Sequence, residues 1–118
     1  MGTQVTLFRS LLAAMLIAVS IYTALVIAQH GWNLFPIFFG DIAAMTWPGQ
    51  FNVDFTGFLI LSALWTAWRN HFSPLGLALA AVAFVGGMMF LTIYLLVVSG
   101  QTKGDIRAVL LGPRRAGA

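Results

Sequence analysis

The residues of this chain that could do chemistry are few. Its 118 residues include two histidines, three acidic residues, six lysines and arginines, and no cysteine. The sequence has no nucleophile, histidine and carboxylate spaced for acyl transfer, no paired carboxylates, no phosphate-binding Gly-rich loop and no cluster of metal ligands. The absence of cysteine also excludes thiolate metal sites and disulfides. We therefore expect a protein that is not an enzyme and needs no metal or cofactor.

The stretch Trp47–Gly57 is where polar side chains run directly into an apolar sequence of membrane length. Polarity at membrane depth is costly and needs a reason. In one interpretation Asp54 lies near a helix start, where the helix dipole stabilises a carboxylate and Asn52 caps the same turn. In the other, Asp54 handles a proton or cation, or pairs with Lys103 or Arg107 from the end of a later helix.

His30 follows the first apolar run, close to the negative end of the expected helix. An interfacial cap is the simplest role for it, and axial ligation of a haem or chlorophyll-type pigment is the sharper one. His71 falls on the opposite side of the expected bundle, which argues against a bis-histidine cytochrome. Only a pigment site with a single histidine remains as an alternative.

Composition places the protein in a membrane. Hydrophobic residues make up 60% of the chain and charged residues 8%, and the mean hydropathy is +0.93, whereas a soluble domain carries about 25% charged residues. The net charge is +3, and the basic residues lie next to hydrophobic runs. At such positions they are expected to contact lipid phosphates rather than nucleic acid. We expect one all-α integral membrane domain over residues 1–118, without room for a separate soluble domain.

The hydrophobic runs divide that domain into elements. Helices of about 20 apolar residues are long enough to cross a bilayer. The expected elements are transmembrane helices over about 8–28, 51–68 and 75–99, an interfacial or re-entrant segment over 32–50, and a basic tail over 100–118.

The segment 32–50 is too apolar for a solvated loop and too interrupted to span the membrane. Trp32 and Trp47 at its ends are expected at headgroup level, with Asp41 between them. Pro48 and Gly49 are expected to bend the chain into the second helix. We also expect Gly31 to cap the first helix, because glycine is common at that position.

Small residues recur at helical spacing on the first and third helices and predict close helix packing. The first helix carries Ser10, Ala14 and Ala18, and the third carries Gly76, Ala80, Ala83 and Gly87. The third-helix face is expected to meet Thr56, Ala63 and Ala67 of the second. Three helices cannot bury all of these faces, so the first helix is the best candidate for an external contact.

The ends of the third helix carry local signals. Ser73 is expected to cap its start, with Pro74 at the first helical position. Asp105 is expected to cap a short helix on the membrane surface, which Gly112 and Pro113 end. Residues 114–118 are expected to be loose.

Orientation follows from the basic residues. With three spans, Arg9 and Arg69 lie on one side and four basic residues of the tail on the other, which favours a cytoplasmic C-terminus and an external N-terminus. His30, Asp41, Asp54, Lys103 and Arg107 then gather at one interface. If residues 34–48 also crossed, nearly all basic residues would share a side, but Asp41 and the shortness of the run argue against that alternative.

Four segments resemble a family of small uncharacterised bacterial inner-membrane proteins with three helices. They are Gly40-Asp41-Ile-Ala-Ala, Trp47-Pro-Gly-Gln-Phe-Asn-Val-Asp-Phe, Leu64-Trp-Thr-Ala-Trp-Arg69 and Arg107-Ala-Val-Leu-Leu-Gly112. The resemblance implies the three-helix architecture and a bacterial source. It implies no activity.

These observations favour a non-enzymatic accessory or assembly subunit of a larger bacterial membrane complex, respiratory or photosynthetic. Its expected partners are membrane lipids and other integral membrane subunits. The alternative is a protein that binds a lipid, quinone or pigment against residues 32–50, with His30 or Asp54 as the polar contact. A transporter is disfavoured, because the helices offer only mild polar residues at mid-membrane.

Overall fold

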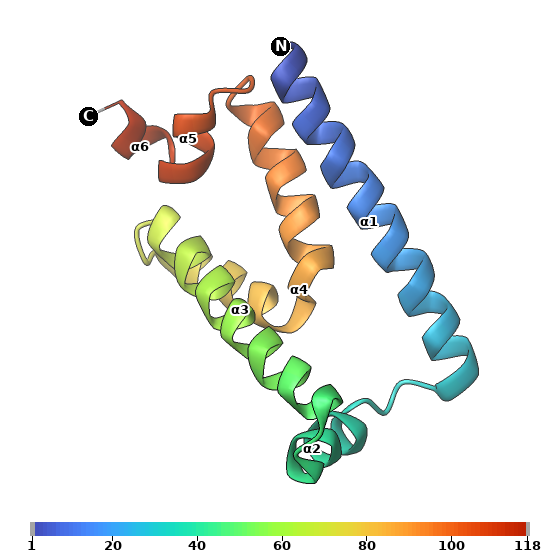
Figure 1. Ribbon diagram of the computed structural model, residues 1–118. Coiled ribbons are helices and arrows are strands. Elements are labelled where there is room, and N and C mark those ends of the chain that lie inside the picture. The colour runs from blue at the N-terminus through green and yellow to red at the C-terminus, as the bar shows by residue number, and fades with distance from the viewer. Residues whose placement is uncertain (1, 118) are drawn as a thin grey trace.

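The computed structural model describes residues 2–117, and these are helical with no strand. The expected all-α class is confirmed. The helices are α1 (Thr3–His30), α2 (Phe35–Ala44), α3 (Trp47–Arg69), α4 (Pro74–Gln101), α5 (Ile106–Leu111) and α6 (Pro113–Ala116). Figure 1 shows α1 standing beside the second half of α4, with α3 diverging from both.

Two helices, α1 and α4, are long and apolar enough to cross a membrane, and each contains an 18-residue stretch with a mean hydropathy of 2.5 and 2.4, respectively. α1 begins five residues before the predicted start at residue 8 and ends at His30, two residues after the predicted end, where the Gly31 N–H donates to the Ile27 carbonyl. Gly31 has φ +80, a conformation that glycine adopts without steric cost. The predicted cap is therefore confirmed.

The connection between α1 and α3 contains a helix of its own. Residues 35–44 form α2, which ends at Met45 in the left-handed conformation with φ 59. α3 then starts at Trp47, four residues earlier than predicted, with Pro48 in its first turn. The expected bend at Pro48 and Gly49 is wrong, because proline suits the first turn of a helix, where its missing N–H has no partner to lose.

α4 is not the straight span expected over 75–99. Gly87, with φ 55 and ψ −131, has a non-helical backbone and divides α4 into two helical halves. Gly87 lies beside the first half of α3, since a Cβ built on it would be 3.1 Å from the Phe55 ring. Seven residues later, Tyr94 lies beside the C-terminal end of α3, since its hydroxyl is 2.8 Å from Asn70 Nδ2. The start of α4 is at this same end of α3. α4 therefore descends along α3, turns at Gly87 and returns. Each half is about 20 Å long and cannot cross about 30 Å of hydrocarbon alone.

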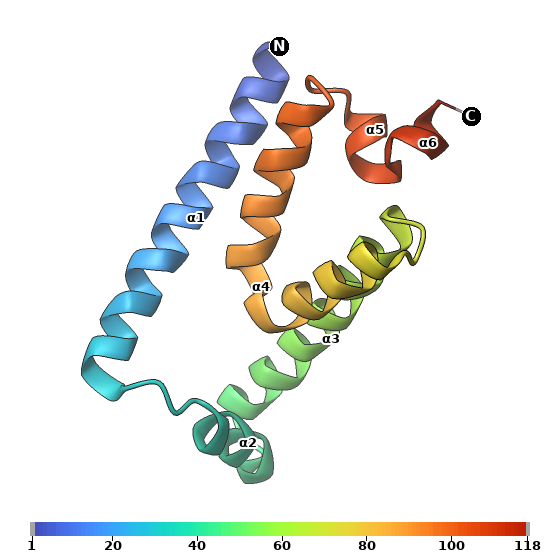
Figure 2. The same ribbon diagram turned by 180° about the vertical axis from the view of Figure 1, so that it is seen from behind.

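This reversal brings the start of α1 and the short helices after α4 to one end of the molecule (Figures 1 and 2). Arg9 Nη2 donates to the Leu96 carbonyl at 3.3 Å, and a Cβ on Gly104 would meet the Val5 side chain at 2.9 Å. The expected separation of the N-terminus from the tail is wrong, because it assumed that α4 crosses the membrane once.

The core lies where α3 packs on α4 and where α4 packs on α1. Ala83 is fully buried and Ala67 is 5% exposed, so small residues do line the close contact between α3 and α4. The hydroxyls of Thr66 and Thr92 are buried as well. They donate to the carbonyls of Ser62 and Met88, each four residues earlier, which satisfies them within their own helices.

Candidate functional site

The predicted polar cluster is divided between the two ends of the molecule. All six lysines and arginines belong to the start of α1, the end of α3 and the chain after α4, which form the upper end in Figure 1. His30, Asp41 and Asp54 belong to the end of α1, to α2 and to the first half of α3. The expected gathering of these groups at one interface is wrong.

Asp54 consequently has neither of its predicted roles. It is the eighth residue of α3, beyond the first turn to which the effect of the helix dipole is limited. Lys103 and Arg107 are at the opposite end, so no pair with them forms. The Asp54 side chain is exposed, and within residues 2–117 it makes no hydrogen bond or ion pair.

Asn52 joins α3 to α2 instead of capping α3. Its Nδ2 donates to the Phe38 carbonyl at 3.1 Å. The two helices also approach closely at Gly49, which is buried, and a Cβ there would collide with the Asp41 backbone. Asp41 thus contributes its main chain to the contact between α2 and α3, and the residue is half-buried.

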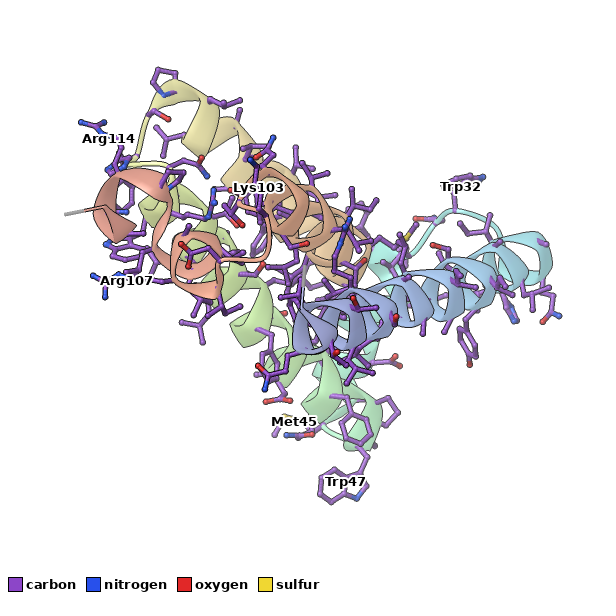
Figure 3. The ribbon with its side chains drawn as sticks, turned by 90° about the horizontal axis from the view of Figure 1, so that it is seen from above. Trp32, Met45, Trp47, Lys103, Arg107 and Arg114 are labelled. Atoms are coloured by element: carbon purple, nitrogen blue, oxygen red, sulfur yellow. The ribbon has the colours of Figure 1, made fainter. Side chains whose placement is uncertain are left out.

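His30, Trp32 and Trp47 lie at the same end, and all three are exposed. Trp32 and Trp47 are 84% and 73% exposed, and both project away from the body of the molecule (Figure 3). Such projecting indoles suit the headgroup region of a bilayer. His30 is the last residue of α1, and within residues 2–117 no group of three potential metal ligands includes it.

The small residues of α4 have different surroundings. Ala83 faces the core and Ala80 is half-buried. Gly76 is buried in the turn, where a Cβ would lie 2.7 Å from the Asn70 Cβ. The Ser73 hydroxyl accepts from the Gly76 N–H at 3.0 Å, which confirms the predicted cap. Gly87, predicted as a packing residue, is the hinge of the helix.

An apolar cavity of about 670 Å³ lies between α2, α3 and the descending half of α4. Its size is in the range of small-molecule pockets. Neither His30 nor Asp54 lines it, so the polar contact expected for a bound lipid or quinone is not provided by these residues. The lining consists of Leu34, Phe35, Phe38, Phe39, Ile42, Val53, Thr56, Gly57, Leu59, Ile60, Phe84 and Val85.

The opposite end is built around Arg69, a residue that sequence reasoning placed at the membrane surface. It is only 7% exposed. Its Nε donates to the Val109 carbonyl at 2.7 Å and its Nη2 to the Ala108 carbonyl at 3.2 Å, while its Nη1 lies 3.1 Å from the Tyr94 hydroxyl. The signal for this site is the short helix α5, whose last carbonyls need donors from outside the helix.

Other residues of α3 also hold the tail. Trp65 Nε1 donates to the Leu110 carbonyl at 2.9 Å. The Arg115 guanidinium lies 3.9 Å from the centre of the Trp68 ring, a cation–π contact, and it donates to the Trp68 carbonyl. Asp105 caps α5 as predicted, accepting from the Arg107 N–H at 3.1 Å. The tail was expected to be loose from residue 114, yet residues 113–116 form α6.

The remaining cations of this end are turned outward. Lys103, Arg107 and Arg114 are exposed, and all three are seen when the molecule is viewed onto this end (Figure 3). His71 lies in the turn beside them. Its imidazole is exposed overall, yet its pKa is lowered from 6.5. The largest cause is partial loss of hydration, and the positive charges of Arg115 and Arg114 add smaller contributions.

The geometry thus offers an exposed carboxylate face on α3, an apolar cavity beside α2 and a positively charged end. Comparisons of the chain with protein-family models, with curated proteins and with solved structures found no match.

Proposed function

We propose that this protein is a non-enzymatic accessory or assembly subunit of a larger bacterial membrane complex, respiratory or photosynthetic. The observation that supports this most is the exposure of α1 on the sides that do not face α4. Of its 28 residues only Leu12 is buried, and large apolar side chains are exposed along its length, among them Leu11, Ile17, Ile21 and Leu25.

The small residues of α1 face away from the rest of the chain. Ser10, Ala14 and Ala18 are all exposed. At 100° per residue, the centre of this stripe lies about 160° around the helix from Leu12, which faces α4. Lipid tails need no such stripe, whereas a helix of another subunit uses it to approach closely.

Photo-crosslinking in the native membrane tests this proposal. A photoreactive residue at Ala14 should capture another integral membrane subunit, and the substitution Ala18→Ile should abolish that capture by filling the stripe. Ala24→Ile is the matched control, because Ala24 is also exposed but lies about 80° around the helix from the stripe. Capture of lipid alone, or equal effects of the two substitutions, would contradict a subunit interface on α1.

The proposed location is the bacterial inner membrane, with both termini in the cytoplasm. All six basic residues share an end with the two termini, and the connection between α1 and α3 carries none. The positive-inside rule therefore favours this orientation. Because the chain has no cysteine, single cysteines at Gly2 and Gly117 provide a clean test: both should react with an impermeant maleimide only in inverted vesicles.

A second function is favoured by the apolar cavity. We propose that it accepts a hydrocarbon chain of a membrane lipid or quinone, with the headgroup outside it. Val53→Trp would fill the cavity and should reduce the lipids or quinones that co-purify, whereas Val97→Trp changes an exposed residue outside it. Identical lipid content in the two variants would remove this function.

A further inference from the structure

Asp54 is exposed on the side of α3 that the protein leaves uncovered. At 100° per residue, it lies about 160° around the helix from Thr56, Ala63 and Ala67, which face α4. Its neighbours on this side, Phe58 and Leu61, are 67% and 63% exposed. An ionisable side chain is thus set into an otherwise apolar surface.

The depth of Asp54 makes this exposure significant. It lies seven residues from Trp47, about 10 Å along the helix, with a further 20 Å or so to Arg69. Taking the exposed Trp47 as the marker of one membrane interface places the carboxylate inside the hydrocarbon layer. Carboxylates at that depth are rare and pair with another group, and Asp54 lacks the long aliphatic stem by which lysine and arginine reach the headgroups.

Within residues 2–117, no lysine or arginine lies at the end of the molecule that carries Asp54. All six lysines and arginines are at the other end of the molecule, and the ionisable groups at its own end are Asp41 and His30. A second copy inserted in the same direction would present the same arrangement, with its basic residues again at the far end. A lysine or arginine at the depth of Asp54 therefore has to come from a different protein.

The surface around Asp54 has the shape that a helix needs. Asp54, Gly57, Phe58, Ile60 and Leu61 line a shallow depression of about 400 Å³. A Cβ on Gly57 would meet nothing within 4 Å, so the space beside this glycine is open, and we call this open position the notch. Small residues of this kind let a second helix approach closely within a membrane.

We propose that the Asp54 face, formed by Asp54, Gly57, Phe58 and Leu61, docks a transmembrane helix of a different subunit that carries a lysine or arginine at the depth of Asp54. This rests on the proposed function as an accessory subunit and names the chemistry of its partner. The charge pair sets the register of the two helices, and the notch at Gly57 sets their distance.

The test uses the full chain in its native membrane, with a photo-crosslinking phenylalanine analogue at Phe58. Captured proteins are identified by mass spectrometry, and capture is compared for Asp54→Asn and Asp54→Glu. We expect a protein with a basic residue within a membrane span, a loss of capture of about tenfold or more with Asp54→Asn, and retention with Asp54→Glu. Asp41→Asn, which removes the neighbouring carboxylate, should leave capture unchanged.

A charge exchange completes the test. Asp54→Lys should abolish capture, and replacing the partner's basic residue by Asp should restore it. Capture that is insensitive to Asp54→Asn, capture of lipid or of this chain alone, or an equal loss with Asp41→Asn would overturn the proposal. A photoreactive residue at Ala14 separates the two hypotheses: capture there without capture at Phe58 leaves the accessory function standing and refutes the Asp54 face.

Discussion

Replacing Arg69 by Met should release the C-terminal tail from α3. The two side chains have similar length, but Met donates no hydrogen bond. The substitution removes the bonds from Nε to the Val109 carbonyl, at 2.7 Å, and from Nη2 to the Ala108 carbonyl, at 3.2 Å. Tyr94 keeps its bond from Asn70 at 2.8 Å, so the loss falls on α5.

The size of the effect follows from these two bonds. A hydrogen bond from a charged donor contributes about 1.5–3 kcal/mol, and carbonyls left buried without a donor add a similar cost. Trp65 still holds the Leu110 carbonyl, and water can reach α5 once Arg69 is gone. We therefore expect the free energy of opening α5 to fall by about 3 kcal/mol, which corresponds to about 100-fold faster opening-limited exchange.

Hydrogen exchange of residues 106–112 in nanodiscs measures this directly, through amides such as that of Gly112, which donates to the Ala108 carbonyl. Arg107→Met is the matched control, because it removes the same charge from an exposed position of α5. Arg69→Lys should give an intermediate rate, since lysine keeps the charge but cannot reach both carbonyls in a fixed fork. Equal exchange in Arg69→Met and Arg107→Met would refute the reasoning.

Three further predictions concern stability. Gly49→Ala should lower the melting temperature, because the new Cβ collides with the Asp41 backbone and destabilises the fold by about 1–3 kcal/mol. Gly40→Ala is the control and should not lower the melting temperature, because a Cβ there meets nothing within 4 Å. Gly87→Ala should cost a similar amount, because φ +55 strains an L side chain, and a melting temperature equal to that of Gly40→Ala would contradict the hinge. The pKa of His71 is lowered from 6.5, so its NMR titration midpoint should lie below that value. A lowered pKa in the folded state means that the unfolded chain binds a proton more readily than the folded one. The free energy of unfolding should therefore be highest above pH 6.5 and should decline as the pH falls toward the pKa of the folded state. His71→Gln should remove this part of the pH dependence.

The features predicted correctly from the sequence are local ones. Gly31, Ser73 and Asp105 cap helices through bonds to residues at most four positions away, so the residue type and its neighbours suffice to recognise them. The start of α3 could also have been found, because Pro48 is a common residue of a helical first turn. Placing the start at residue 51 made Asp54 look like part of that turn.

The wrong placement of Lys103 and Arg107 beside Asp54 arose from one backbone angle. Gly87 fits a small-residue packing stripe as well as it fits a hinge, and only its positive φ distinguishes the two. Once α4 reverses, Lys103 and Arg107 move to the other end of the molecule from Asp54. Arg69 was missed because its partners Ala108 and Val109 are about 40 positions away: the short helix α5 indicates that its last carbonyls need outside donors, but not which residue supplies them.

The reversal of α4 has a consequence for how the chain enters a membrane. The orientation proposed above needs α1 to cross in one direction and α3 to cross back, and the segment between these two helices contains a single charged residue, Asp41. The basic residues that follow α4 are synthesised after both helices and stay on the side of the ribosome. Insertion of one hairpin therefore fixes the topology before the second half of the chain has been made, and α4 needs only to dip into the bilayer beside helices already in place.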